Sequence, residues 1–244
     1  MTNNSVMLLG CVSSYIAFDH IEQCADAVLF NTQREYFYQC TPGQWRSYVA
    51  NVGSVIHAMA CTWATLFAFG ADIAGEPEWK ANMQWFLPLS LGYFVNDLSG
   101  MEFRGGAMGL HHVLVIIFET YALLADPQTT PELDLIFGFL LFELSSVPLG
   151  LGQLKRGLPS NPKSDITSKE ELDAKWYAYQ FAALYFAIRI IYFHFFMIPY
   201  ICAVHPHFLT TAGGGLVGWV VYGLSALQSY WFYGIVRLVA KLGA

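Results

Sequence analysis

The sequence has little charge. Only 12% of its 244 residues are Asp, Glu, Lys or Arg, while 55% are hydrophobic. Soluble domains carry about twice that charged fraction, so the composition argues against a soluble protein. Charge is almost absent from residues 49–70, 106–125, 133–154, 176–204 and 213–236. Each of these runs approaches or exceeds the roughly 20 apolar residues that span a bilayer, which predicts an all-α integral membrane protein.

Several other common signals are missing. There is no basic stripe with interleaved aromatic residues, so we expect no nucleic-acid partner. The five cysteines are scattered and lack CxxC spacing, so neither a disulfide framework nor a zinc site is expected. The N-terminal residues MTNNS lack the basic region and cleavage site of a signal peptide. We therefore expect the first hydrophobic segment to direct insertion into the membrane.

About seven transmembrane helices are expected. They fall near residues 6–30, 47–70, 83–98, 107–125, 132–152, 174–203 and 213–238. The first is interrupted by polar residues between Asp19 and Asp26, so it could span the membrane or lie at its interface. We expect residues 1–44 to form this helix and a cytosolic loop, and residues 45–240 to form one membrane domain.

The charges of the loops predict the orientation. If the N-terminus is lumenal or extracellular, the cytosolic segments hold Arg34, Arg46, Arg104, Lys155, Arg156, Lys163, Lys169 and Lys241. The opposite side then holds essentially Lys80, together with several acidic residues. Because short cytosolic loops are enriched in Lys and Arg, this asymmetry predicts a cytosolic C-terminus.

Polar residues at the cytosolic ends of two expected spans predict a pocket. Asn96 and Asp97 end one span, and His111 and His112 lie roughly 6–8 Å inside the next. Ionisable groups are too costly to face lipid, so they point into the bundle or a cavity. The sequence therefore predicts a polar pocket, inside an apolar bundle, that opens toward the cytosol.

A second set of polar residues lies deeper in the membrane. His57, Glu119 and Glu143 fall near its middle, and Arg189 lies deeper still. Glu119 follows His112 by seven residues, so the two share one helix face. Tyr93 and Asp97 share a face in the same way.

Several of these residues also have a purely structural explanation. Asp97 could cap its helix or pair with Arg104, Glu143 could pair with Arg189, and His57 could bond a neighbouring helix. The adjacent pair His111-His112 favours a functional role, because imidazole can act as a base, a nucleophile or a metal ligand. No metal site is expected, because His194, His205 and His207 fall at the other end of the bundle.

Six short motifs, in order, resemble one family. They are N-x-x-S-x-x-H (Asn51, Ser54, His57), LGYFVNDL (91–98), LHHVLVI (110–116), FELSSVPL (142–149), FAIRIIYFHFFMIPY (186–200) and ALQSYWFYGIVRLVAKL (226–242). Together they resemble the TLC domain, over roughly residues 45–240. The chain looks closer to the smaller TLC-domain proteins than to the ceramide synthases.

The resemblance implies six helices around a cytosol-facing cavity, a preceding helix, an endoplasmic-reticulum membrane and lipid substrates. In the ceramide synthases the matching His-His pair is required to transfer a fatty acyl group from acyl-CoA to a sphingoid amine. Those enzymes also have an HD-x-x-D element, where this sequence has residues 142–146, with Glu143 as the acidic candidate.

The leading hypothesis is acyl transfer from acyl-CoA to a lipid amine or hydroxyl, with the acyl chain in the bundle cavity and no bound cofactor. His112 would be the base or acyl carrier, oriented by Glu119 or Asp97, with His111 and His57 assisting. The expected catalytic residues are His111, His112 and Asp97, and the expected substrate-binding residues are Asn51, His57, Tyr93, Asn96, Glu119, Glu143 and Arg189. The alternatives are a non-catalytic lipid-binding, transport or regulatory protein, or a structural subunit of an oligomer or larger membrane complex.

Overall fold

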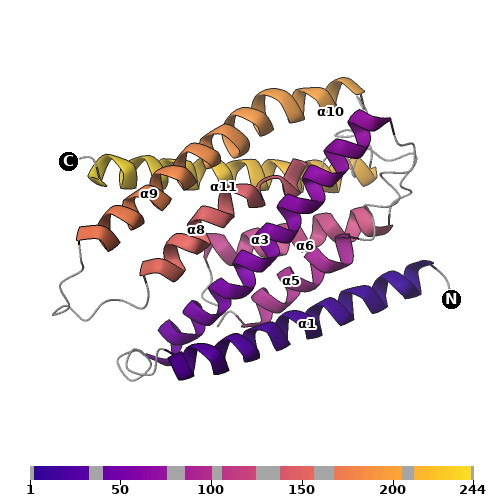
Figure 1. Cartoon of the computed structure of the whole chain (residues 1–244). Helices are drawn as coiled ribbons and strands as arrows, with labels where there is room; N and C mark the ends of the chain where they lie inside the picture. The colour runs from indigo at the N-terminus through magenta and orange to yellow at the C-terminus, as the bar shows by residue number, and fades with distance from the viewer. Residues whose placement is uncertain are drawn as a thin grey trace.

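The computed structural model describes residues 3–32, 41–75, 86–100, 106–124, 138–156, 168–204 and 212–242. Within these ranges the chain is almost entirely helical, and no strand occurs. The helices are α1 (Asn3–Thr32), α3 (Pro42–Ala74), α5 (Leu87–Gly100), α6 (Ala107–Leu124), α8 (Glu143–Arg156), α9 (Ser168–Leu184), η1 (Tyr185–Met197), α10 (Ile198–Val204) and α11 (Ala212–Leu242). The two termini lie at opposite ends of the bundle (Figure 1).

The helices pack in a closed ring. Around this ring, α3 contacts α8, α8 contacts α9, α9 and η1 contact α11, α11 contacts α6, α6 contacts α5, and α5 contacts α3 again. Helix α1 lies outside this ring and packs on α5 and α3. The helices of this ring therefore share one interior.

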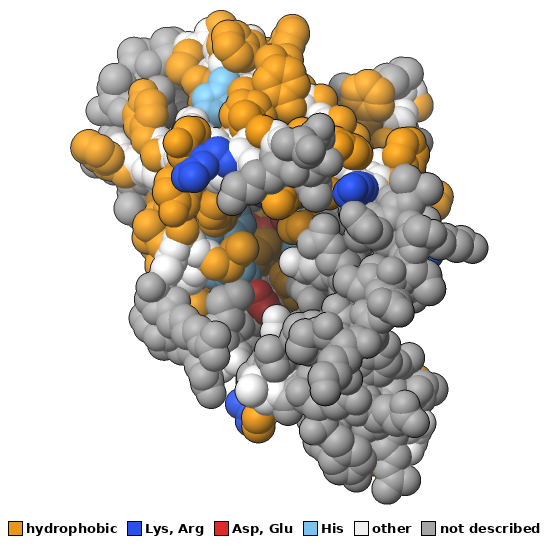
Figure 2. Space-filling model, turned by 90° about the vertical axis from the view of Figure 1, so that its left-hand side faces the viewer, with side chains coloured by type: hydrophobic (Ala, Val, Ile, Leu, Met, Phe, Trp, Pro, Cys, Tyr) orange, Lys and Arg blue, Asp and Glu red, His pale blue; other side chains and the backbone are white. Residues whose placement is uncertain are grey.

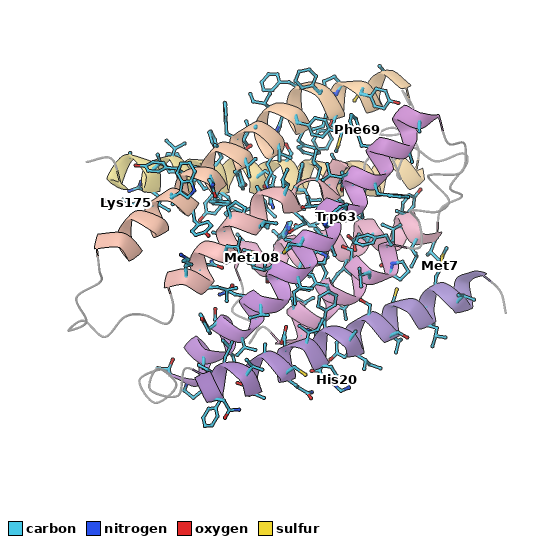
Figure 3. All side chains as sticks on the ribbon, viewed as in Figure 1. Met7, His20, Trp63, Phe69, Met108 and Lys175 are labelled. Carbon is cyan, nitrogen blue, oxygen red and sulfur yellow. The ribbon has the colours of Figure 1, made fainter. Side chains whose placement is uncertain are left out.

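Three helices among the described residues are long and apolar enough to cross a membrane. They cover Trp45–Ala71, Ala107–Leu124 and Lys175–Tyr200. Their outer surfaces carry large apolar side chains: Trp63 and Phe69 of α3, labelled in Figure 3, are 72% and 64% exposed. Such a surface suits lipid tails rather than water, which agrees with the integral membrane protein expected from composition.

Two helices are shorter than the spans expected from the sequence. Helices α5 and α8 have 14 residues each, about 21 Å of helix against a hydrocarbon core of about 30 Å. The span expected at 132–152 is interrupted at 141–142 by a turn. Successive three-residue hydrogen bonds (Phe142 to Phe139, Leu144 to Leu141, Ser145 to Phe142) tighten the chain there.

The segment α9–η1–α10 runs without a break from Ser168 to Val204, and its centre is π-helical. At its end the N–H of Ile198 donates to the carbonyl of Phe193, five residues earlier. Segments of π-helix are rare and are frequently found at functional sites. This one carries Arg189, and no pattern in the sequence predicts a π-helix there.

Glycines allow two pairs of helices to approach closely. A Cβ at Gly92 of α5 would come within 2.8 Å of the Cys11 carbonyl oxygen of α1. A Cβ at Gly150 of α8 would overlap the side chain of Val55 of α3. Small residues at helix contacts are how membrane bundles gain packing energy, because apolar burial alone does not drive association in lipid.

Candidate active site

A cavity of about 1350 Å³ lies inside the helix ring. It opens at the end of the molecule where α1 ends and α9 begins, and Figure 2 shows that face hollowed, with acidic and histidine side chains in the hollow. Cavities for drug-sized ligands occupy about 300–1,000 Å³. The larger volume leaves room for a lipid-sized ligand.

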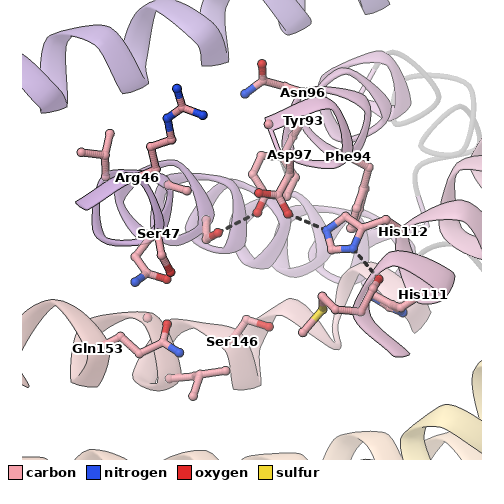
Figure 4. Close-up of a pocket in the computed structure, with 18 of the residues that line it drawn as sticks. Arg46, Ser47, Tyr93, Phe94, Asn96, Asp97, His111, His112, Ser146 and Gln153 are labelled. Carbon is pink, nitrogen blue, oxygen red and sulfur yellow. Dashed lines mark hydrogen bonds and ion pairs between the residues drawn. The ribbon is translucent and has the colours of Figure 1, made fainter. Parts of the chain in front are cut away.

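His112 and Asp97 form a close pair in the cavity wall. Nε2 of His112 lies 2.6 Å from Oδ2 of Asp97, and Nδ1 of His112 lies 2.8 Å from the carbonyl oxygen of Met108 (Figure 4). The carbonyl can only accept, so Nδ1 carries a hydrogen and donates it. Both ring nitrogens are thus occupied by the protein, and Asp97 contacts His112 directly.

His111 is in a different position. It lines the same cavity, and its ring packs edge-on against Trp231 at 5.2 Å and against His112 at 5.5 Å. Its Nδ1 is buried and has no hydrogen-bond partner among the described residues. Buried polar atoms nearly always have a partner, so an unpaired one in a cavity wall marks a place where a ligand or water can bind.

Arg189 of η1 is held against the start of α8. Its guanidinium donates to Oγ of Ser145 (2.9 Å), Oγ of Ser146 (2.9 Å), the Phe142 carbonyl (3.0 Å) and Oε1 of Gln228 (3.3 Å). The side chain of Glu143 is 3.9 Å away, at the outer limit of an ion pair. Arg189 is buried and lines the cavity, so a positive charge lies in its wall.

A separate polar network lies behind the cavity wall. The hydroxyl of Ser90 donates to Oε1 of Glu119 at 2.7 Å, and Nε2 of His57 lies 3.1 Å from the same hydroxyl. The ring of His57 stacks on Tyr93 at 3.9 Å, and the Tyr93 hydroxyl bonds Ser54 at 2.7 Å. His57, Ser90 and Glu119 are buried and are not among the cavity-lining residues, so Tyr93 separates this network from the cavity.

Most of the residues expected at the site come together. Those that line the cavity are Asn51, Tyr93, Asn96, Asp97, His111, His112, Glu143 and Arg189. His57 and Glu119 do not, and Glu119 bonds Ser90 rather than orienting His112. The reason is that a shared helix face fixes a direction but not depth, and Glu119 lies two turns further along α6.

The remaining residues singled out from the sequence either contact other partners or lie outside the described residues. Glu143 lies beside Arg189, as the alternative explanation of a buried ion pair predicts. His194 bonds Ser225 at 2.7 Å, and it is not a cavity-lining residue. Arg104, His205 and His207 fall outside the described ranges, as do Lys80, Arg34 and Lys163. Among the residues that the structure describes, no group of three or more His, Cys, Asp or Glu side chains could hold a metal ion.

Helix α1 contributes acidic residues to the cavity that the sequence did not assign to it. Asp19, Glu22 and Asp26 all line it, and Oε1 of Glu22 accepts a hydrogen bond from Asn96 Nδ2 at 3.2 Å. Their spacing of three and four residues places them on one helix face, which was the available signal. Ser146 of α8 and Trp231 of α11 are further lining residues with no such signal.

The fold and the site together define a helical membrane protein with a polar cavity inside its bundle. The profile of the TLC-domain family matches residues 47–237, and the chain belongs to that family. Searches among curated proteins and among solved structures gave no match.

Proposed function

We propose that this protein binds an acyl lipid in its cavity and transfers the acyl chain from acyl-CoA to a lipid amine or hydroxyl. The observation that carries the proposal is the unpaired Nδ1 of His111, beside the His112–Asp97 pair in the wall of a lipid-sized cavity. A nitrogen without a hydrogen-bond partner among the described residues can take a proton from a substrate that reaches it, which a general base requires.

The roles of the two histidines differ in this proposal. The Nδ1 of His111 takes the proton from the acceptor amine or hydroxyl as that group attacks the thioester carbonyl. The carbon–sulfur bond then breaks, and the same proton passes to the departing thiolate, so that the products are the acyl lipid and free CoA. His112 and Asp97 share a proton beside His111, and this pair influences His111 through its charge and position.

The membrane setting fits a soluble donor and a lipid acceptor. The cavity opens at the end of the bundle where α6 begins and α8 ends, which the loop charges assign to the cytosol. Acyl-CoA would enter from that side, and the acyl chain would extend between the helices. An endoplasmic-reticulum membrane, with the N-terminus in the lumen, completes the proposal.

The test is acyl transfer by the purified protein in lipid vesicles. Labelled acyl-CoA is supplied with sphingoid, lysolipid and glycerol-lipid acceptors, and the wild type is compared with His111→Gln, His112→Gln and His20→Gln. Loss of a general base costs about 10²- to 10⁴-fold in rate, so we expect His111→Gln to fall in this range. His20 is exposed on α1 and does not line the cavity, so His20→Gln should retain the wild-type rate.

Two outcomes contradict catalysis. If no acceptor is acylated while the wild type still binds lipid, the cavity serves lipid binding, transport or regulation without chemistry. If His111→Gln and His20→Gln transfer equally well, the unpaired nitrogen has no role in the reaction.

A further inference from the structure

Two adjacent serines of α8 contact the same arginine in different ways. Ser145 is fully buried; its Oγ accepts from Arg189 Nε at 2.9 Å and its hydroxyl donates to the Phe142 carbonyl at 2.8 Å. Ser146 Oγ also accepts from Arg189, at 2.9 Å, but its hydroxyl hydrogen has no acceptor among the described residues. Ser146 lines the cavity, and Figure 4 shows its side chain directed into it. Ser145 is therefore internally satisfied, whereas Ser146 has a donor left for a ligand.

The guanidinium of Arg189 also has a donor to spare. Of its five N–H groups, one on Nε and two on the NH2 nitrogen are used by Ser145, Phe142 and Ser146. The NH1 nitrogen gives one of its two hydrogens to Gln228. The other has no acceptor among the described residues.

Gln228 of α11 adds further unpaired donors next to Arg189. Its Oε1 accepts from the Tyr185 hydroxyl at 2.6 Å and from Arg189 at 3.3 Å, which fixes the direction of the amide. Its Nε2 is buried and has no partner in the described part of the chain. Among the described residues, Ser146, Arg189 and Gln228 thus each have a donor without an acceptor, and leaving buried donors unpaired is costly.

We infer that Ser146 and Arg189 form a subsite for the carbonyl oxygen of an acyl ester or thioester bound in the cavity. The carbonyl oxygen is an acceptor without a proton, which suits a set of donors. Because Glu143 lies 3.9 Å from Arg189, the local charges partly cancel. A neutral carbonyl therefore fits better than a full carboxylate or phosphate.

The arginine acts on the ligand mainly through the serine. A hydroxyl whose oxygen accepts from a buried cation becomes a stronger donor, because hydrogen bonds in a chain polarise one another. Arg189 is thus a positioning residue, and Ser146 makes the contact. The inference rests on the proposed function, since it assumes that the cavity holds an acyl lipid. If acyl transfer occurs, the same donors would stabilise the negative charge that develops on this oxygen.

The test compares two ligands that differ only in the carbonyl. A long-chain fatty acid methyl ester and the methyl ether of the same chain length compete with a fluorescent acyl probe for the full-length protein in detergent. One hydrogen bond to a carbonyl contributes up to about tenfold in affinity, so the wild type should bind the ester several-fold to about tenfold more tightly than the ether. Ser146→Ala should bring this ratio close to one, Ser146→Thr should restore it, and Ser145→Ala should leave it unchanged.

The possible outcomes test the carbonyl subsite and the proposed acyl transfer separately. A wild-type ratio near one, or an equal loss in Ser145→Ala and Ser146→Ala, overturns the subsite. Preference for the ester that depends on Ser146, without acyl transfer to any acceptor, supports the subsite and contradicts the proposed enzyme. Normal acyl transfer without a preference for the ester supports the proposed enzyme and contradicts the subsite.

Discussion

His112 is held at both ring nitrogens by groups that accept hydrogen bonds. Met108 offers only a carbonyl oxygen, and Asp97 offers a carboxylate at 2.6 Å. The pair must therefore hold a proton between them, either as imidazolium and carboxylate or as imidazole and carboxylic acid. His112 can reach a substrate only by giving up one of these contacts, whereas His111 need not. The two neighbouring histidines are thus suited to different tasks: His111 can contact a substrate, and His112 is held by the protein.

Replacing Asp97 by Asn tests this division. The amide keeps the shape of the side chain but removes the charge and the shared proton, and it can hold the imidazole of His112 in the wrong tautomer. We expect the rate of acyl transfer at saturating acyl-CoA to fall by about 10- to 100-fold, while lipid binding changes little.

The matched control for that change is Asp19→Asn. Asp19 also lines the cavity, but its carboxylate accepts from Gln23 at 2.8 Å rather than from a histidine. It should retain most of the activity. Equal losses in both variants would show that the cavity needs negative charge in general and would remove the special role of Asp97.

Helix α1 lies outside the residues matched by the family profile, yet it is part of the cavity wall. Its contact with α5 is polar as well as apolar: Ser14 donates to the Leu89 carbonyl at 2.8 Å, and Glu22 accepts from Asn96 at 3.2 Å. Hydrogen bonds between membrane helices help to hold the helices together and fix their relative orientation. The acidic face of α1 is thereby held toward the site.

Gly92→Val tests that contact. A Cβ at this position would press on Ser14 and the Cys11 carbonyl, and overpacking of this kind costs about 1–3 kcal/mol. We expect a lower melting temperature in detergent and weaker lipid binding, because α1 would move away from α5 and open the cavity wall.

The control for Gly92→Val is Gly70→Ala. A Cβ at Gly70 of α3 would meet nothing within 4 Å, and Ala is the better helix former. This variant should melt at the same temperature as the wild type or slightly higher. If both variants melt alike, the close approach of α1 to α5 contributes nothing to stability.

At the scale of the whole molecule, the helices alternate between the two ends of the bundle, so the termini lie on opposite sides (Figure 1). The cavity opens at the end that also holds the C-terminus. The proposed orientation, with the basic segments in the cytosol, would make this end the cytosolic one.

Epitope tags at the two termini test the orientation. In cells whose plasma membrane alone is permeabilised, an antibody should reach the C-terminal tag, and it should reach the N-terminal tag only after the internal membranes are opened. Simultaneous access to both tags would mean that α1 does not cross the membrane. Access to the N-terminal tag alone would invert the proposed orientation.

The amino-acid sequence alone was enough to predict the class of this protein, the approximate positions of its helices and eight polar residues that line the cavity. These follow from hydrophobic length and from the cost of placing His111, Asp97 or Arg189 in lipid, which are properties of local composition. The cost of burial predicts that a polar group faces inward, but not which partner it meets there.

Those partners follow from the packing of the helices. Packing pairs His112 with Asp97 and leaves Nδ1 of His111 without a partner among the described residues, and it places Glu119 behind the wall with Ser90. It also brought the acidic face of α1 to the cavity and separated the roles of two consecutive serines at Arg189. The physical reason is that each contact joins residues from different helices. Helical periodicity fixes the face of each residue, but only packing fixes the rotation and depth of one helix against another.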